Sequence, residues 1–364
     1  MKYRDEFARE DLAEAFSRII KDIGLTENIN LMEVCGTHTH SIAKYGIRDM
    51  LPPNIRLLSG PGCPVCVTPN LFIDQLTVLA EMPGVIITTF GDMVRVPGSF
   101  SSLQETKGRG ADVRICYSPD DAVRIAEENP DKKVVFAGVG FETTAPGVAA
   151  AIIDAGEKNL SNFFVLAGFK TLPNALRALA QMPDLNLNGL ICPGHLSVVT
   201  GTSIYREMAE VFKIPCVISG FEALDILETI RLLLLQISEG RAEVENGYSR
   251  VVRDEGNPKA MAILGEVFRE TDSVWRGIGN ISSSGLVLNE KYSRFDALNL
   301  INVNIPAPVE PSFCICGQIL TGVKTPADCP GFGKACTPDN PAGACMVSSE
   351  GACAAWYRFG RNIE

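Results

Sequence analysis

Short apolar runs rich in valine, isoleucine and phenylalanine recur between about residues 29 and 219. Most of them end in glycine, serine or threonine, and many are separated by segments whose apolar residues have the period of a helix. The eight runs are INLMEV, IRLLSG, GVIITTF, DVRICYS, KKVVFAGVG, NFFVLAGF, GLICPG and PCVISGF. Because strands that alternate with helices form βαβ units, the sequence predicts an α/β fold with largely parallel sheets.

A polar, glycine-rich stretch from about 97 to 110 interrupts this pattern and indicates a boundary inside the α/β region. We therefore predict two similar parallel-sheet α/β domains, at 1–105 and 106–220. The helical pattern near 221–245 is a candidate to pack back onto the first of them.

After Gly247 the strand runs fade, and the segment 256–270 is predicted to be a helix. The stretch from 306 to 351 is dense in proline, glycine and cysteine and has too few apolar residues to form a core unaided. Such a segment needs another source of stability, for example a metal centre. We predict a third domain at 246–364, mainly helix and loop.

Composition excludes several classes of protein. The net charge of -10 and the pI near 5.0 argue against binding to a phosphate backbone, so we expect no nucleic-acid partner. The longest aliphatic run, Leu232 to Leu235, is far shorter than the roughly 20 residues that cross a bilayer. The charged N-terminal pattern lacks the apolar segment of a signal peptide. We expect a cytoplasmic protein without a membrane partner.

The twelve cysteines and three histidines are unevenly placed. In a reducing cytosol, so many cysteines indicate metal or redox chemistry more than structural disulfides. All three histidines, His38, His40 and His195, lie within five residues of a cysteine, in loops that follow predicted strands. Such loops at the carboxyl ends of strands carry function in α/β sheets. Any single one of these histidines could still be a satisfied core residue.

Cys63 and Cys66 form a single CxxC pair in the loop GPGCPVC. Thr68 and Pro69 are typical of a helix start, which would place the pair just ahead of a helix N-terminus, where a thiolate is favoured. A zinc ribbon of paired CxxC motifs is disfavoured because the chain has no second CxxC. A redox dithiol or an open site for iron or another soft metal ranks above an inert buried pair.

Cys35 directly follows the first predicted strand and precedes Gly36. It is a candidate reactive thiol with His38 or His40 near it. A nucleophilic hydrolase would combine Cys35 with His195, but such an enzyme gives no reason for the many other cysteines.

The last 51 residues hold six cysteines, and this is the strongest cofactor signal in the chain. An iron–sulfur cubane takes four thiolates from a loop-rich peptide, and zinc would also take four. A zinc-stabilised structural interaction module is therefore an alternative. Two surplus thiols could form a second dithiol beside a cluster. The six are Cys314, Cys316, Cys329, Cys336, Cys345 and Cys353.

The motifs CGTHTH, GPGCPVC, GDMVRVPG, GFETTAPG and PGHLS, with the cysteine-rich tail, resemble the NiFe-hydrogenase maturation protein HypD family. The resemblance runs from about residue 28 to 358. It implies a cytosolic scaffold on which the Fe(CN)2CO group of the hydrogenase is built, with two similar α/β domains and one 4Fe-4S cluster.

The same resemblance implies partners and roles. The partners are a HypC-type chaperone, a HypE-type donor of cyanide supplied through HypF, and indirectly the hydrogenase large subunit. Cys35 would hold Fe(II), facing the redox dithiol of Cys63 and Cys66. We further predict that His38, Glu142 and His195 lie around this pocket as hydrogen-bond or proton-transfer groups. The implied cluster ligands are Cys314, Cys329, Cys336 and Cys353, which leaves Cys316 and Cys345 as the second dithiol.

Overall fold

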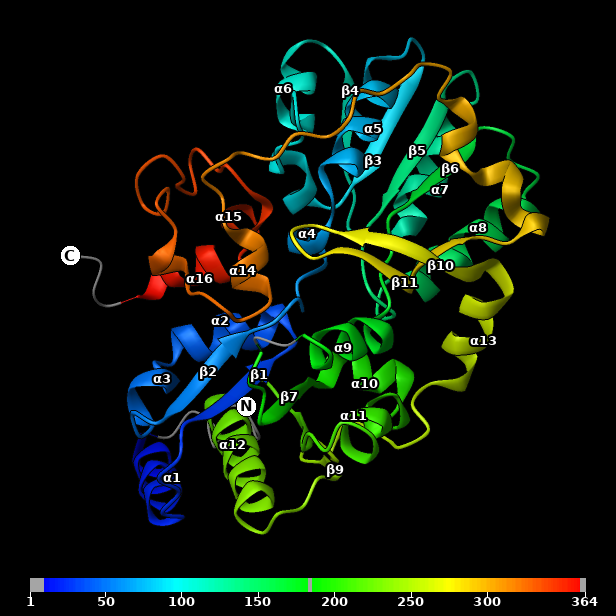
Figure 1. Cartoon of the computed structure of the whole chain (residues 1–364). Coiled ribbons are helices and arrows are strands. Elements are labelled where there is room, and N and C mark those ends of the chain that lie inside the picture. The colour runs from blue at the N-terminus through cyan, green and yellow to red at the C-terminus, as the bar shows by residue number, and fades with distance from the viewer. Residues whose placement is uncertain (1–9, 183–184, 361–364) are drawn as a thin grey trace.

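A computed structural model describes residues 10–182 and 185–360, and it contains two parallel sheets and a cysteine-rich lobe (Figure 1). The α/β fold class is confirmed, and all eight predicted runs form strands. The first sheet has the order β2-β1-β7-β8-β9, and the second has the order β4-β3-β5-β6. The strands of the first sheet are β1 (Ile29–Glu33), β2 (Ile55–Ser59), β7 (Gly189–Pro193), β8 (Cys216–Ser219) and β9 (Val244–Asn246). Those of the second are β3 (Val85–Thr89), β4 (Asp112–Ile115), β5 (Lys133–Gly138) and β6 (Phe163–Ala167).

The two sheets do not follow the predicted ranges 1–105 and 106–220. Strand β3 falls in the first range but pairs with β4 and β5, whereas β7 falls in the second range but pairs with β1. The second sheet is thus inserted between two segments that together build the first. An apolar run shows that a strand is buried, but it does not show which neighbour the strand pairs with. The charged N-terminal segment 1–9 lies outside the described residues.

Helices cover both faces of the first sheet. One face carries a core cluster that includes Ile29 and Leu31 of β1 and Leu227 of α12. The opposite face carries Leu190, together with Leu176 of α9 and Leu196 of α10. The helices of the first face are α1 (Glu10–Asp22), α2 (Gly36–Lys44), α3 (Ile47–Met50) and α12 (Ala223–Ser238). Those of the second face are α9 (Leu172–Ala180), α10 (Gly194–Thr200) and α11 (Arg206–Glu210). Helix α12, within the segment 221–245, therefore packs on the same sheet as β1.

The second sheet is also sandwiched between helices. Along β5, Val134 and Phe136 point to one core cluster and Val135 and Ala137 to the other, as the alternation of a strand requires. One face is covered by α5 (Asn70–Glu81) and α6 (Leu103–Gly108), and the other by α7 (Pro119–Glu128) and α8 (Ala145–Glu157), with α13 (Pro258–Val267) outside α8. The loops that follow the strands of both sheets lie toward the middle of the molecule (Figure 1).

An antiparallel hairpin, β10 (Phe268–Trp275) and β11 (Gly279–Leu288), follows α13. The prediction that strands end near residue 247 and that 256–270 is helical was wrong here, because α13 stops at Val267. The segment FRETDSVW has buried residues only at its two ends and polar or part-exposed residues between them, so it shows no apolar run. Its pairing with the apolar end of β11 supplies the stability that its own sequence does not indicate.

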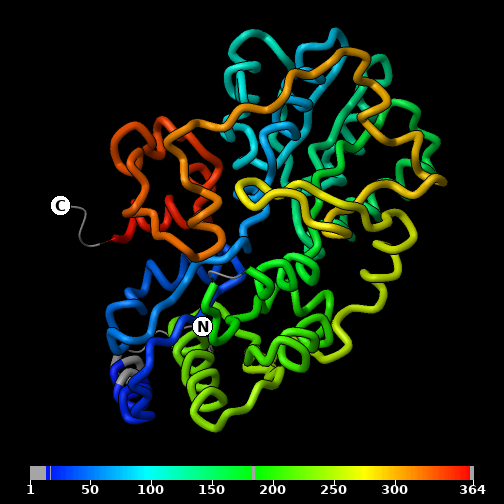
Figure 2. The backbone as a smooth tube through the Cα atoms, in the orientation of Figure 1, coloured from blue at the N-terminus to red at the C-terminus, as the bar shows by residue number. Residues whose placement is uncertain are grey.

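The C-terminal lobe is mostly loop, with short helices α14 (Cys316–Leu320), α15 (Ala344–Val347) and α16 (Ala352–Phe359). An exposed strap from 301 to 312 runs past the second sheet before the chain enters this lobe (Figure 2). Within the two described ranges, no helix combines the length and the apolar composition needed to cross a membrane. The remaining short helical segments are α4 (Pro64–Val67), η1 (Gly91–Arg95), η2 (Ser203–Tyr205), η3 (Glu290–Phe295), η4 (Ala297–Leu300) and η5 (Pro326–Asp328).

Candidate metal and redox centre

The loops after β1 and β2 pack directly against each other. The two strands pair in parallel up to Glu33 and Ser59, so their following loops leave the sheet side by side. The Gly36 N–H donates to the Gly62 carbonyl oxygen at 3.2 Å. A Cβ added at Gly62 would collide with the backbone of Val34 and Cys35, so only glycine fits there. This contact brings the CGTHTH loop beside the GPGCPVC loop.

Cys63 and Cys66 form a disulfide with a Cα–Cα distance of 5.2 Å, and both are buried. The predicted helix start is confirmed, because α5 begins at Asn70 with Pro69 as its N-cap, and the pair lies ahead of it. The pair also belongs to a short helix of its own, α4, which was not predicted. Cys63 is the N-cap of α4, Pro64 is its first residue, and the Cys66 N–H donates to Cys63 Sγ at 3.2 Å. The sulfurs are therefore held by one tight turn.

The Cys35 thiol is buried beside these residues. Burial raises the pKa of Cys35 to about 12, and the charges of Glu350 and Glu33 act in the same direction. The thiol is thus protonated at neutral pH when no cation is bound. A hydrolase would need an activated thiolate paired with a base. Among the described residues, no hydrogen bond joins Cys35 to His195, whose ring stacks on Phe221.

The ring of Phe221 also joins the two predicted pocket histidines. His38 stacks on it with ring centroids 4.8 Å apart, and His195 stacks on it at 3.9 Å. His38 donates from Nε2 to the Gly220 carbonyl at 2.8 Å, and burial lowers the pKa of His38 to about 4. His38 Nδ1 is buried and has no partner among the described residues. Neutral His38 therefore has a lone pair on Nδ1 that accepts no hydrogen bond from the described residues.

Glu33 and Glu350 belong to this site and were not predicted. Glu33, buried in β1, accepts from the Cys35 N–H at 3.2 Å and from Thr39 Oγ1 at 2.6 Å. Burial raises the pKa of Glu33 to about 8. Glu350, from the C-terminal lobe, accepts from Thr37 Oγ1 at 2.6 Å. The signal for Glu33 was a charged residue inside an otherwise apolar strand run.

The third histidine faces the lobe. His40 Nδ1 lies 3.2 Å from the Ser349 carbonyl oxygen, and its ring packs edge-on against Phe359. Together with the bond between Thr37 and Glu350, this contact joins the CGTHTH loop to the tail.

Glu142 occupies a different position. Its carboxylate accepts from the Leu172 N–H at 3.0 Å at the start of α9, and its second oxygen is buried without a partner in the described structure. No hydrogen bond or ion pair joins this carboxylate to Cys35, His38 or His195 among the described residues. Burial raises the pKa of Glu142 to about 7.

We expect Glu142→Gln to change the pH dependence of folding. Because the folded-state pKa of Glu142 lies above its ordinary value of 4.5, the folded protein holds a proton that the unfolded chain has lost between about pH 4.5 and 7. The protonated Glu142 side chain therefore contributes its full stabilisation below about pH 4.5, and this stabilisation is lost as the pH rises to about 7. Relative to the variant, the wild type should lose about 2 kcal/mol between pH 5 and 7. Urea unfolding at several pH values measures this, and a difference independent of pH would contradict it.

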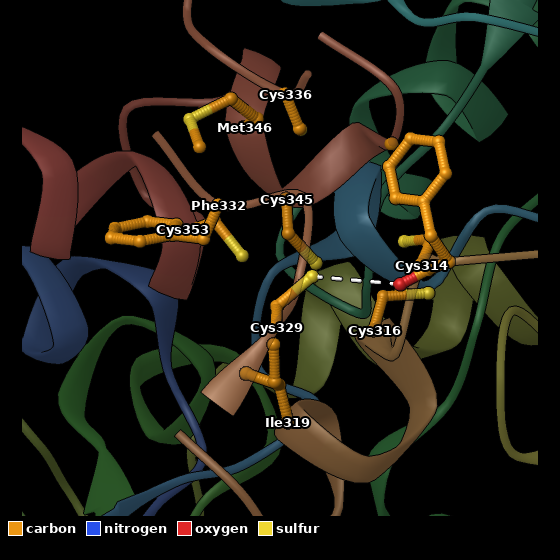
Figure 3. A pocket seen from close by; sticks show the side chains of 11 residues that line it. Cys314, Cys316, Ile319, Cys329, Phe332, Cys336, Cys345, Met346 and Cys353 are labelled. Atoms are coloured by element: carbon orange, nitrogen blue, oxygen red, sulfur yellow. Dashed lines mark hydrogen bonds between the residues drawn. The ribbon is translucent and has the colours of Figure 1, made fainter. Parts of the chain in front are cut away.

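All six C-terminal cysteines line one cavity in the lobe (Figure 3). The other lining residues are mainly apolar, including Phe313, Ile319 and Phe332. Figure 3 shows Cys329, Cys345 and Cys353 directed toward one another. The structure thus gathers thiols that are spread over 40 positions of the sequence.

The donor set fits an iron–sulfur cluster. The cavity presents sulfur donors, and the Ala342 N–H donates to Cys336 Sγ at 3.3 Å, a bond typical of cluster ligands. Burial raises the pKa of Cys353 well above its ordinary value, and the charges of neighbouring cysteines act in the same direction. Four thiolates can therefore coexist in this cavity only around a group of positive charge, such as the iron ions of a cluster. A single ion needs its ligands to converge on one point, and no three suitable side chains among the described residues do so. In a cubane each thiolate binds a different iron, so its ligands stand farther apart.

Within the cavity, Cys314 and Cys316 interact directly. The Cys316 thiol donates a hydrogen bond to Cys314, which lowers the pKa of Cys314 and raises that of Cys316. The charge of Cys345 also raises the pKa of Cys316. The predicted division into four cluster ligands and a Cys316–Cys345 pair stays a prediction.

The disulfide and the cavity belong to one buried cluster. Helix α15, which carries Cys345, packs against α4, which carries Cys66 (Figure 1). Cys63 and Cys66 share a core cluster with Cys316, Cys336 and Cys353. The structure therefore brings together three sulfur sites: the Cys35 thiol, the disulfide and the six-cysteine cavity.

The chain is similar to known proteins along nearly its whole length. A family model named HypD and described as "Hydrogenase formation hypA family" matches residues 9–360. The hydrogenase maturation factor HypD2 of Bradyrhizobium diazoefficiens is 45% identical over 99% of this chain and 97% of its own length. HypD of Azotobacter vinelandii is 45% identical over 99% of this chain and 97% of its own length. HypD of Escherichia coli K12 is 47% identical over 91% of this chain and 89% of its own length.

Proposed function

Because the chain belongs to the HypD family of hydrogenase maturation factors, we propose that it is the scaffold on which the Fe(CN)2CO group of a NiFe hydrogenase is assembled. The observation that carries the proposal is the packing of the CGTHTH loop on the GPGCPVC loop, which brings Cys35 beside a disulfide. A thiol beside a redox pair suits an iron cargo that must be held and then released. The assembly takes place in the cytoplasm.

Cys35 binds the iron cargo. Soft thiolates suit an Fe(II) that also carries cyanide and carbon monoxide. Because burial holds the Cys35 thiol protonated, iron binding displaces its proton. Glu33 fixes the backbone of this residue through the Cys35 N–H, and His38 offers Nδ1 as a hydrogen-bond acceptor toward the cargo or its ligands. His195 lines the more exposed side of the same site.

Cys63 and Cys66 act as a switch. Two electrons and two protons convert their disulfide into two thiols, one of which then joins Cys35 in holding Fe(II). A 4Fe-4S cluster, when bound, supplies single electrons to this sulfur chemistry. Cys314, Cys329, Cys336 and Cys353 would hold it, with Cys316 and Cys345 as a neighbouring dithiol.

The partners follow from the same proposal. A HypC-type chaperone would contribute a further ligand to the iron and carry the product toward the hydrogenase large subunit. A HypE-type donor would supply cyanide as thiocyanate. The exposed side of the site, near His195 and Glu350, is where both would need access.

Metal content tests this proposal. Protein purified without oxygen should contain iron and acid-labile sulfide in equal amounts and absorb broadly at about 400 nm. Mild oxidation followed by chelation should remove both and bleach the colour. Colourless protein with stoichiometric zinc would instead indicate an interaction module, and labelling of Cys35 by an acylating probe without iron would indicate a hydrolase.

A further inference from the structure

Arg276 sits at the tip of the β10–β11 hairpin, between α4 and the cysteine cavity. Its N–H donates to the Val67 carbonyl at 2.8 Å, one residue after Cys66. The next residue, Gly277, has a φ of 73° and abuts Gly317, which follows Cys316. A side chain at either glycine would collide with the other's backbone, so the hairpin tip is wedged between the two sulfur sites.

The guanidinium of Arg276 is buried with an incomplete set of partners. Its side chain is 1% exposed, Nε pairs with Glu310 at 3.2 Å, and Nη2 donates to the Pro97 carbonyl at 3.3 Å. Nη1 is buried and has no acceptor among the described residues. An arginine stays charged in proteins, and its ion-pair partner Glu310 is 45% exposed and well solvated. Much of this positive charge is therefore left to act on its surroundings.

The hairpin tip that carries Arg276 adjoins the cavity. Gly277 packs against the start of α14, which carries Cys316, and Glu310 lies four residues before Cys314. Arg276 and Glu310 form an ion pair at 3.2 Å, so a positive and a negative charge both lie on the side of the cavity that Cys314 and Cys316 line.

We propose that Arg276 is a positioning residue that stabilises negative charge in the six-cysteine cavity and thereby raises the reduction potential of the cluster held there. The inference rests on the proposed function, because it requires a cluster in this cavity. One-electron reduction of the cluster adds one negative charge and breaks no bond, so a fixed cation beside the ligands favours the reduced state. Hydrogen bonding and net charge near the sulfurs are established determinants of such potentials.

The wedge also gives the hairpin a functional role. Arg276 donates its N–H to the carbonyl of Val67, and the next residue packs on Gly317, so the hairpin tip fixes the disulfide turn relative to the cavity.

The test compares full-length wild type with Arg276→Gln, Arg276→Lys and Glu310→Gln, each purified and reconstituted without oxygen. The midpoint potential of the cluster is read from its absorbance during titration with dithionite. Arg276→Gln should lower the equilibrium constant for reduction about tenfold, which is about 59 mV for one electron. Arg276→Lys keeps the positive charge, so its potential should stay close to that of the wild type. Glu310→Gln removes a negative charge and should raise the potential.

Glu310→Gln keeps the inference testable if Arg276→Gln fails to fold, because Glu310 lies on the exposed strap. Unchanged potentials in Arg276→Gln and Glu310→Gln, at full iron content, would overturn the inference alone. Equal shifts in Arg276→Gln and Arg276→Lys would also overturn it, since loss of shape and not of charge would then be the cause. Wild-type protein without iron and sulfide would overturn the proposed function, and this inference with it.

Discussion

Replacing Cys63 or Cys66 by alanine should abolish hydrogenase maturation and leave the iron–sulfur cluster intact. Either change removes one sulfur of the disulfide, so the remaining thiol can no longer be oxidised or reduced within α4. The cavity cysteines come from residues 314 to 353 and keep their full set of thiols. Hydrogenase activity in cells that carry only the variant gives the first readout, and absorbance and iron content of the purified variant give the second.

A matched control is Cys116→Ala. Cys116 is also buried, but it follows β4 in the second sheet and packs in a different core cluster. This variant should lose some stability, since a small buried side chain is removed, while maturation continues. Normal maturation in Cys63→Ala and Cys66→Ala would refute the redox role of the pair. Loss of acid-labile sulfide together with iron from both would show that their sulfurs serve the cluster and not a separate switch.

The second large effect is expected from Gly62→Ala. A Cβ at this position would enter the backbone of Val34 and Cys35, which cannot move without disturbing β1. Overpacking of this kind destabilises a protein by about 3 kcal/mol. Because the added methyl group would push the two loops apart, maturation should fail even where the variant still folds. Urea unfolding and the maturation assay together measure both effects.

Gly147→Ala provides the comparison for this variant. Gly147 is exposed in the first turn of α8, and a Cβ there meets no atom within 4 Å. Alanine in a helix should stabilise the protein by about 0.5 to 1 kcal/mol and leave maturation unchanged. Equal stabilities of Gly62→Ala and Gly147→Ala would show that the loops are free to separate, contrary to the contact described above.

Local sequence patterns predicted where most strands lie, but not which strands pair with one another. Strands β3, β7 and β8 are buried on both faces of their sheets, which is why they are continuous apolar runs, whereas the edge strands β2 and β4 each have an exposed position. The hairpin was missed because β10 is largely polar, and β9 because it is three residues long. The pairing of β1 with β7 joins residues about 158 positions apart, and no local pattern encodes that distance.

The residues of the candidate site were likewise predicted only in part. Its cysteines and histidines were predicted because these residue types are rare and gather in loops after strands. Glu350 was missed because its partner Thr37 lies 313 positions away, and nothing in the tail's own composition marks it. Arg276 was missed because a single arginine in a polar turn looks like any solvated residue. Only its burial distinguishes Arg276 from a solvated arginine, and that burial is produced by three separate segments of the chain.

The insertion of the second sheet between β2 and β7 has a consequence for synthesis of the protein. The segment that carries Cys35, Cys63 and Cys66 leaves the ribosome early, but β1 keeps an open edge until β7 at Gly189–Pro193 has been made. The tail that covers the CGTHTH loop through Glu350 arrives last of all. Unpaired strand edges in a growing chain are prone to wrong association. The reactive thiols thus spend most of translation uncovered, and the centre closes only when the final helices dock.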